Sequence, residues 1–307
     1  MKMNSKDIKC YSCGTFLKTN EPTWQGLHTH CFCITFGLKD PETFQDVIAR
    51  GEEKNLENDW MKRIASSFFH GKFRKYSARL GTKSYLLKVQ QPEYPELPAT
   101  EFLSNQIAQY LGLKVPEFSL ILFEDKRDTF VCENFMQEHS GSDLVHIYRY
   151  LKTPDQFSCE GLLRVLEKEI GRLEEIHRFV ELCLFDSLTG NNDRHGRNLG
   201  IIQSGRQSFL APFYDNPSYL ALEDPDFLGV QHEPRGAIAT QKTQEPTMKD
   251  YVLEWNRLGF DEPIKLFKKR VNLSEINKLI SNSFISHERQ NALIRLIERR
   301  HQELLNA

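Results

Sequence analysis

The sequence lacks a long apolar run and a marked excess of charge of one sign. No window approaches the roughly eighteen uncharged apolar residues of a membrane-spanning helix, and the beginning, MKMNSKDIKC, lacks the apolar core of a signal peptide. The 40 basic and 42 acidic residues leave a formal net charge of −2, which gives no general attraction to nucleic acid or membrane. We therefore expect a cytoplasmic protein that binds neither directly, with delivery into a host cell as an open alternative.

The seven cysteines are an odd number, so they cannot all pair in disulfides. Four of them precede residue 34, a distribution that favours a metal site over a framework of disulfides. Cys132, Cys159 and Cys183 lie in apolar segments, so we expect them to be reduced core residues. With 307 residues, 39% of them apolar and 27% charged, the chain has a globular composition and room for two lobes.

The segment 10–33 concentrates possible metal ligands, because a C-x2-C pair is followed by HTHCFC. Tetrahedral zinc needs four soft or borderline ligands, and this segment offers more than four. So short a segment has few apolar residues, and metal binding would contribute about 10 kcal/mol or more to its folding. We expect a structural zinc site, with a metal-free remnant as the alternative. The candidate ligands are Cys10, Cys13, His28, His30, Cys31 and Cys33.

The N-terminal half beyond this segment is rich in predicted strands. Residues 84–89 (SYLLKV) predict a strand, and residues 118–123 and 129–135, joined by the charged turn EDKRD, predict an antiparallel hairpin. The run from Thr100 to Gly112 has the apolar spacing of an amphipathic helix. The polar composition of residues 39–60 predicts a helix and a connector.

Helical patterns dominate beyond Gly141. The longest, EIGRLEEIHRFVELCLFDSL, predicts a buried helix that ends at Gly190. Residues 199–202 and 207–210 predict a second small hairpin. A strand-rich half followed by a helical half indicates an α+β fold.

A polar loop, DSLTGNNDRHGRNLGII at residues 186–202, interrupts these apolar segments. Asp193 and Asn198 within it have the D-x-x-x-x-N spacing of a kinase catalytic loop, in which the carboxylate accepts the proton of the attacking hydroxyl and the amide oxygen holds magnesium. Asp215, in LAPFYDNPS after the hairpin, could hold the same metal from the end of a strand. Alternatively, Asp215 only begins a turn before Pro217.

Lys88 lies inside a predicted strand, where an ammonium group is costly unless it meets an anion. Glu101, at the start of the following helix, is the candidate carboxylate. Taken singly, Lys88 could lie at a sheet edge and Glu101 could merely favour a helix N-terminus. Together with Asp193, Asn198 and Asp215, they appear in the order that phosphoryl transfer uses, with a lysine and magnesium to stabilise the phosphoryl charge.

No G-x-G-x-x-G sequence precedes the lysine strand, so the usual glycine-rich phosphate loop is missing. The segment 66–80, SSFFHGKFRKYSARL, occupies its place with one glycine and several cations. Gly71 and Lys75 are the candidate phosphate contacts in this segment. The alternative is a basic strand face that is only solvated.

The two segments NNDRHGRNLGII and LAPFYDNPS resemble the signature of the HipA-like serine/threonine kinases, which are toxins of bacterial toxin–antitoxin systems. The likeness extends over residues 66–220 and includes YLLKV and the helix ATEFLSNQIAQYLGLKVP. It implies a two-lobed, protein-kinase-like fold with a strand-rich N-lobe at 39–137 and a helical C-lobe at 138–307. The Cys/His module would occupy residues 1–38.

The resemblance also implies a role for each candidate residue. Asp193 would be the catalytic aspartate, Asn198 and Asp215 the magnesium ligands, and Lys88 the lysine on the ATP phosphates. Residues Glu133 to Phe135 would form the hinge near the adenine. Members of the family use ATP to phosphorylate aminoacyl-tRNA synthetases and are restrained by antitoxin proteins, so we expect such a substrate and partner here.

The short chain and the Cys/His module look most like the HipT subgroup. By this likeness the zinc ligands would be Cys10, Cys13, His28 and Cys31, with His30 and Cys33 as alternates. The family's Gln-Pro-Lys segment is altered to KFRK after Gly71, and its regulatory serine positions fall on Phe68 and His70. The altered segment leaves one alternative, a pseudokinase that binds a partner. A weaker alternative is a kinase of small molecules or lipids, because the same catalytic spacing serves those substrates.

Overall fold

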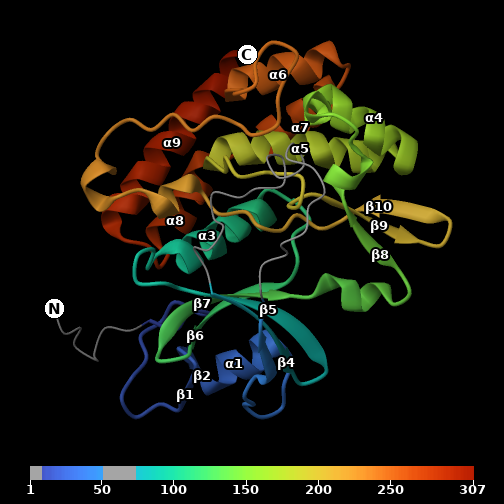
Figure 1. The fold of residues 1–307 in the computed structure, drawn as a ribbon. Coiled ribbons are helices and arrows are strands. Elements are labelled where there is room, and N and C mark those ends of the chain that lie inside the picture. The colour runs from blue at the N-terminus through green and yellow to red at the C-terminus, as the bar shows by residue number, and fades with distance from the viewer. Residues whose placement is uncertain (1–8, 51–73) are drawn as a thin grey trace.

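The structure, a computed structural model, describes residues 9–50 and 74–307. Figure 1 shows two lobes, with a β-sheet in the lower part and a group of helices in the upper part. The first lobe comes from the N-terminal half of the chain, and the second comes from the C-terminal half. The predicted two-lobed α+β fold is therefore confirmed.

The N-terminal lobe contains a five-stranded antiparallel sheet in the order β3-β4-β5-β7-β6. The predicted strand at 84–89 and the predicted hairpin are confirmed as β5 and as the pair β6 and β7. The strands are β3 (Gln45–Ala49), β4 (Arg74–Leu80), β5 (Lys83–Val89), β6 (Phe118–Phe123) and β7 (Arg127–Glu133).

The predicted polar helix at 39–60 is wrong where the structure describes it, because residues 45–49 form the edge strand β3. All five of its side chains are exposed, so the sequence shows no alternation between a buried and a solvated face. Pairing with β4 supplies the hydrogen bonds that make this segment a strand. Residues 51–60 lie outside the described part of the chain.

The Cys/His module packs against one face of this sheet. It contains β1 (Thr23–Trp24), β2 (Leu27–His28) and α1 (Thr29–Phe36). Its helix α1 lies beneath the sheet in Figure 1, and its buried side chains share one hydrophobic core with those of the sheet. Because side chains alternate along β5, Tyr85 and Leu87 face the module, whereas Lys88 faces the other lobe.

Helix α3 (Leu97–Tyr110) covers the opposite face of the sheet, between the two lobes in Figure 1. It begins three residues before the predicted start at Thr100, with Pro98 in its first turn, where a missing amide hydrogen costs nothing. Leu103 and Ile107 of α3 are fully buried and join the larger hydrophobic core of the molecule. Helix α3 thereby connects the sheet to the helices of the C-terminal lobe.

The C-terminal lobe is built around α5 (Leu173–Thr189), which ends at Gly190 as the sequence predicted. The predicted hairpin at 199–210 is confirmed as β9 (Gly200–Ser204) and β10 (Gln207–Leu210), and β8 (Asp143–His146) extends it to a three-stranded sheet. The other helices are α4 (Cys159–Glu169), α6 (Met248–Arg257), α7 (Asp261–Arg270), α8 (Leu273–Ser281) and α9 (His287–Asn306).

Five short 3-10 helices complete the described secondary structure. They are η1 (Phe135–His139), η2 (Ile147–Tyr150), η3 (Pro154–Gln156), η4 (Tyr219–Leu222) and η5 (Pro225–Phe227). Within residues 9–50 and 74–307, none of the helices combines the length and the apolar character that crossing a membrane requires.

Candidate active site

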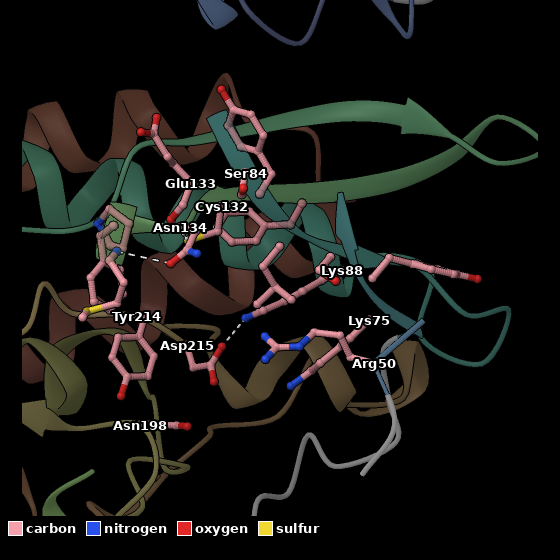
Figure 2. Close-up of a pocket in the computed structure, with 18 of the residues that line it drawn as sticks. Arg50, Lys75, Ser84, Lys88, Cys132, Glu133, Asn134, Asn198, Tyr214 and Asp215 are labelled. Carbon is pink, nitrogen blue, oxygen red and sulfur yellow. Dashed lines mark hydrogen bonds and ion pairs between the residues drawn. The ribbon is translucent and has the colours of Figure 1, made fainter. Parts of the chain in front are cut away.

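A cavity of about 1000 Å³ lies between the two lobes. Figure 2 shows its polar side chains converging from the sheet and from the loops of the C-terminal lobe. The structure does not place Asp193 in the cavity lining, and Gly71 lies outside the described residues. The sequence-predicted residues that line it are Lys75, Lys88, Glu101, Glu133, Phe135, Asn198 and Asp215.

Lys88 joins both lobes through two carboxylates. The side-chain nitrogen lies 2.5 Å from Oε1 of Glu101 in α3, and it forms a second ion pair with Asp215 from the loop after β10. The exposed fraction of Lys88 is 2%, and its ammonium group also lies 5.5 Å from the centre of the Phe130 ring. The expectation that a lysine inside a strand must meet an anion is confirmed.

The charges in this cluster depend on one another. Burial lowers the pKa of Lys88, but Asp215 and Glu101 outweigh burial and raise it above its ordinary value. Burial raises the pKa of Asp215, but Lys88 and Lys75 outweigh burial and hold it below its usual range. Burial also raises the pKa of Glu101 despite the attraction of Lys88. Lys88 and Asp215 are therefore both charged at neutral pH.

The backbone at Asp215 is held in a strained conformation. Its φ is 55°, in the left-handed region that a non-glycine residue adopts at a cost of about 1–3 kcal/mol. The amide of Asn191 donates a hydrogen bond to the carbonyl oxygen of Asp215, and Arg194 donates one to the carbonyl oxygen of Tyr214. These contacts fix the direction in which the Asp215 carboxylate projects.

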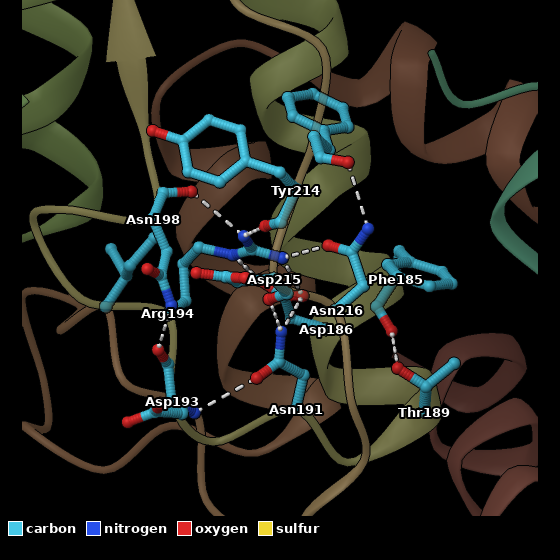
Figure 3. A network of polar contacts seen from close by, with 12 residues as sticks. Phe185, Asp186, Thr189, Asn191, Asp193, Arg194, Asn198, Tyr214, Asp215 and Asn216 are labelled. Atoms are coloured by element: carbon cyan, nitrogen blue, oxygen red, sulfur yellow. Dashed lines mark hydrogen bonds and ion pairs between the residues drawn. The ribbon is translucent and has the colours of Figure 1, made fainter. Parts of the chain in front are cut away.

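Arg194 is the centre of a buried network in the loop before β9, shown in Figure 3. The guanidinium forms two hydrogen bonds, 2.8 and 2.9 Å long, with the carboxylate of Asp186 in α5. It also donates to the carbonyl oxygens of Asn198 and Tyr214 and to the side-chain oxygen of Asn216. One buried cation thus joins α5, the Asp193 loop and the Asp215 loop.

Two asparagines extend this network to α3. The amide of Asn216 donates to Oδ1 of Asn105 at 3.0 Å, and the amide of Asn105 donates to the carbonyl oxygen of Glu101 at 2.8 Å. The sequence analysis missed the roles of Arg194, Asn216 and Asn105. The only available signal was an arginine in a polar loop directly after the buried Asp186 helix.

Asn198 directs an oxygen toward the cavity. Its side-chain nitrogen donates to the backbone carbonyl of Asp193 at 3.2 Å, so Oδ1 remains to face the cavity with the Asp215 carboxylate. Magnesium prefers such amide and carboxylate oxygens, so these two residues fit the ion. Asp193 is 4% exposed, and its backbone nitrogen is held by Oδ1 of Asn191 at 3.1 Å.

The predicted hinge connects the sheet to the second lobe. Glu133 forms an ion pair of 2.7 Å with Lys83, and the backbone nitrogen of Asn134 donates to the carbonyl oxygen of Ser84. The ring of Phe135 stacks on the ring of Tyr214, with centroids 5.7 Å apart. The side chain of Glu133 is therefore held by Lys83, while the backbone of 133–135 borders the cavity.

Several cavity residues were missed in the sequence. Arg50 follows edge strand β3, its backbone nitrogen donates to the carbonyl oxygen of Lys75, and both residues line the cavity shown in Figure 2. His195 is buried, which lowers its pKa to about 3, although Asp215 partly opposes this effect. His195 is thus neutral at physiological pH. The cations that line the cavity besides Lys88 are Arg50, Arg74, Lys75 and Arg197.

The four residues predicted as zinc ligands meet at the far side of the sheet. One ligand atom from each of them lies within 4.8 Å of the other three. Among the described residues, this is the group that combines three or more possible metal ligands at such short range, and it includes neither His30 nor Cys33. Its members are Cys10, Cys13, His28 and Cys31.

Two lobes around a cavity, a lysine–glutamate pair, and loops carrying an asparagine and an aspartate define a protein with a kinase-like fold. The chain belongs to the family described as HipA-like C-terminal domain, which matches residues 62–284. The family resemblance seen in the sequence is therefore confirmed, while the narrower likeness to the HipT subgroup stays a prediction.

Two solved structures share the fold. The crystal structure of the proinflammatory kinase CtkA from Helicobacter pylori has a TM-score of 0.62 and 18% identity, and the match covers 76% of this chain and 94% of that one. HipA of the Shewanella oneidensis toxin–antitoxin system was solved with HipB and operator DNA. It has a TM-score of 0.52 and 16% identity, and the match covers 75% of this chain and 59% of that one.

One curated protein is related in sequence. "Putative kinase Y4dM" from Sinorhizobium fredii is 25% identical over 151 residues, a match that covers 43% of this chain. The match spans 36% of the length of that relative, so the two proteins share one region and differ in extent.

Proposed function

We propose that the protein is an ATP-dependent serine/threonine protein kinase. The observation that supports this most strongly is the buried Lys88, which meets Glu101 and Asp215 inside the cavity between the lobes. A cation that is held by two carboxylates from different elements, and that still faces a large cavity, suits a phosphate-bearing ligand. Membership of the HipA-like family supports the same reaction.

Each residue then has a role in phosphoryl transfer. Lys88, oriented by Glu101, would contact the phosphates of ATP, and Asp193 would accept the proton of the attacking hydroxyl. Asn198 and Asp215 would hold magnesium, which supplies positive charge against the phosphate oxygens when bound. The backbone at Glu133 to Phe135 would border the adenine. The Arg194 network would hold both loops in place during the reaction.

The cations Arg50 and Lys75 would bind phosphate oxygens in place of a glycine-rich loop. Lys75 is directly opposite Lys88 in the register of β4 and β5, so two like charges lie side by side. Such a pair is destabilising unless anions are near, and the two carboxylates already meet Lys88. Lys75 therefore has a position suited to a nucleotide phosphate, and Gly71 would contribute from the same segment.

The biological setting follows from the relatives by analogy. The structurally similar HipA belongs to a toxin–antitoxin system and was solved with HipB. By this analogy we propose a cytoplasmic toxin that phosphorylates a protein of translation, such as an aminoacyl-tRNA synthetase, and that an antitoxin protein restrains. Mass spectrometry of phosphorylated proteins after brief expression would identify the substrate.

Transfer of labelled phosphate from ATP tests the activity. We expect Asp193→Asn to reduce the rate by about 10²–10⁴-fold, because a positioned general base contributes that much. Asp155→Asn, at an exposed site in η3, is the matched control and should keep the wild-type rate. Equal labelling by the Asp193→Asn protein would remove Asp193 from the mechanism.

A second candidate function is a pseudokinase that binds nucleotide and acts through a partner. The observation that favours it is that Asp193 does not line the cavity, although Lys88 and Asp215 do. A thermal shift with ATP and magnesium but no phosphate transfer to any lysate protein would favour this candidate. Transfer to a small molecule or a lipid headgroup would instead support the weaker alternative of a different substrate class.

A further inference from the structure

The Cys/His module brings its four ligand residues together by two separate local structures. Cys10 and Cys13 lie in a tight turn, in which the backbone nitrogen of Gly14 donates to the carbonyl oxygen of Cys10 and Gly14 has a φ of 71°. His28 precedes α1 and Cys31 lies in the first turn of α1. The two halves meet with all four ligand atoms within 4.8 Å.

Glu21 fixes the orientation of the histidine ring. Its carboxylate lies 3.2 Å from Nε2 of His28, while Nδ1 of the same ring faces the sulfurs of Cys13 and Cys31 at 3.5 and 3.8 Å. A carboxylate that holds the outer nitrogen of a ligating histidine is the usual second contact of a zinc site. Three thiolates and one imidazole complete a tetrahedron and leave no position for a substrate.

The turn between the two cysteines also carries a contact to both lobes. The hydroxyl of Tyr11 donates a hydrogen bond of 2.6 Å to Asp128 in β7. The ring of Tyr11 packs edge-on against Phe284 of the C-terminal lobe, with centroids 4.8 Å apart. Because Tyr11 lies between Cys10 and Cys13 in sequence, the conformation of the cysteine turn determines where this ring lies.

The module also supplies part of a hydrophobic core that it shares with the sheet. Cys10, Leu27 and Phe32 are fully buried, and Phe36 packs edge-on against Tyr85 of the sheet at 5.6 Å. The opposite face of the same strand β5 presents Lys88 to the cavity. The module therefore packs against the strand that carries Lys88, the residue that would contact nucleotide.

We propose that Cys10, Cys13, His28 and Cys31 bind one structural zinc ion that holds the module against the sheet and positions Tyr11 between the lobes. The metal would link the turn at Cys10 to helix α1, in addition to the hydrophobic core that the two share. Zinc binding requires no ATP, so the proposal stands independently of the kinase reaction.

The metal content of the purified full-length protein, kept reduced, tests the proposal. We expect about one zinc per chain in the wild type and less than about a tenth of that in Cys13→Ser, because three ligands bind zinc far more weakly than four. Cys33→Ser, in the same helix as Cys31 but outside the cluster, is the matched control and should keep the wild-type content. Cys13 is exposed, so the serine creates no cavity in the core.

Cobalt replacement gives a readout that needs no variant. The wild type should show the thiolate charge-transfer bands and the strong visible bands of tetrahedral cobalt, which zinc then removes. Glu21→Gln should keep the spectrum but bind zinc about 10–100-fold more weakly. A wild type that binds no zinc when reduced, that binds iron instead, or whose zinc content Cys13→Ser does not change, would overturn the proposal.

Discussion

Two buried cations, Lys88 and Arg194, contact the loop that contains Asp215, and their surroundings differ. Lys88 is 2% exposed and Arg194 is 1% exposed, and each is paired with carboxylates. For both, burial lowers the pKa but the neighbouring carboxylates outweigh burial and raise it. Lys88 nevertheless faces a cavity of about 1000 Å³, whereas Arg194 is enclosed by protein groups.

The difference suggests separate roles for the two cations, one in folding and one in the proposed ligand binding. The planar guanidinium of Arg194 satisfies several acceptors at once and joins α5 to two loops, which a lysine could not do. The ammonium of Lys88 is a point charge that meets Glu101 and Asp215 and remains next to the cavity. We therefore expect the loss of Arg194 to affect folding and the loss of Lys88 to affect ligand binding.

The largest expected effect on stability is that of Arg194→Met. It would leave the Asp186 carboxylate and the acceptors of Asn198 and Tyr214 buried without their partner, at a cost of about 3–5 kcal/mol in unfolding free energy. Denaturant unfolding measures the loss. Arg164→Met, at a side chain that is 73% exposed in an ion pair with Glu160, should cost less than about 1 kcal/mol. Similar losses for both variants would contradict the comparison.

Lys88→Met should affect ligand binding more than stability. We expect a smaller loss of about 1–3 kcal/mol, because the Asp215 side chain is 26% exposed and Glu101 can take up a proton. The thermal shift produced by ATP and magnesium should disappear. Lys265→Met, whose side chain is 69% exposed in α7, should keep that shift. If Lys88→Met keeps an undiminished shift, the cavity does not bind nucleotide through this lysine.

The third effect concerns pH, and it sharpens the comparison because the charge state of His195 depends on Arg194 and on Asp215, the partner of Lys88. Its pKa is lowered to about 3 from an ordinary value of 6.5, chiefly by burial, with Arg194, Arg197 and Lys75 adding to the effect and Asp215 opposing it. The unfolded chain therefore binds more protons than the folded protein between these values. Stability from the neutral ring is full above pH 6.5 and is lost as pH falls toward 3.

Urea unfolding between about pH 4 and pH 7.5 measures this dependence. The wild type should lose up to about 1.4 kcal/mol per pH unit on acidification through this residue. His195→Gln, which cannot titrate, should show a flatter dependence, while His287→Gln should match the wild type because His287 is exposed at the start of α9. Parallel curves for the wild type and His195→Gln would show that another group titrates.

Much of the fold could be predicted because the periodicity of buried residues is local. The helix that ends at Gly190 and the hairpin of β6 and β7 each contain enough apolar residues to reveal their period. Strand β3 could not be predicted, because all its side chains are exposed and only pairing with β4 defines it. Strand β8 is short and half-buried, and it exists because it pairs with β9.

The site was predictable where the sequence contains a local signal, such as a charged residue in a strand or a characteristic spacing. A lysine inside a strand and an Asp–Asn spacing in a polar loop gave Lys88, Asp193 and Asn198 as candidates, and the cavity includes the first and the third. Arg50 and Asn105 gave no such signal. Arg50 follows an unpredicted strand, and Asn105 looks like any polar residue of a helix until Asn216 meets it.

The sequence by itself determined the two halves of the chain, the ligand types in the cysteine module and the order of the charged residues, because composition, spacing and periodicity are properties of neighbouring positions. Only the tertiary structure decided which charges meet. Lys88 and Asp215 are 127 positions apart, and Arg194 joins segments that come together only when α5 is buried. Burial makes these ion pairs and hydrogen bonds matter for stability, because a charge removed from water is costly unless its partners lie at fixed positions.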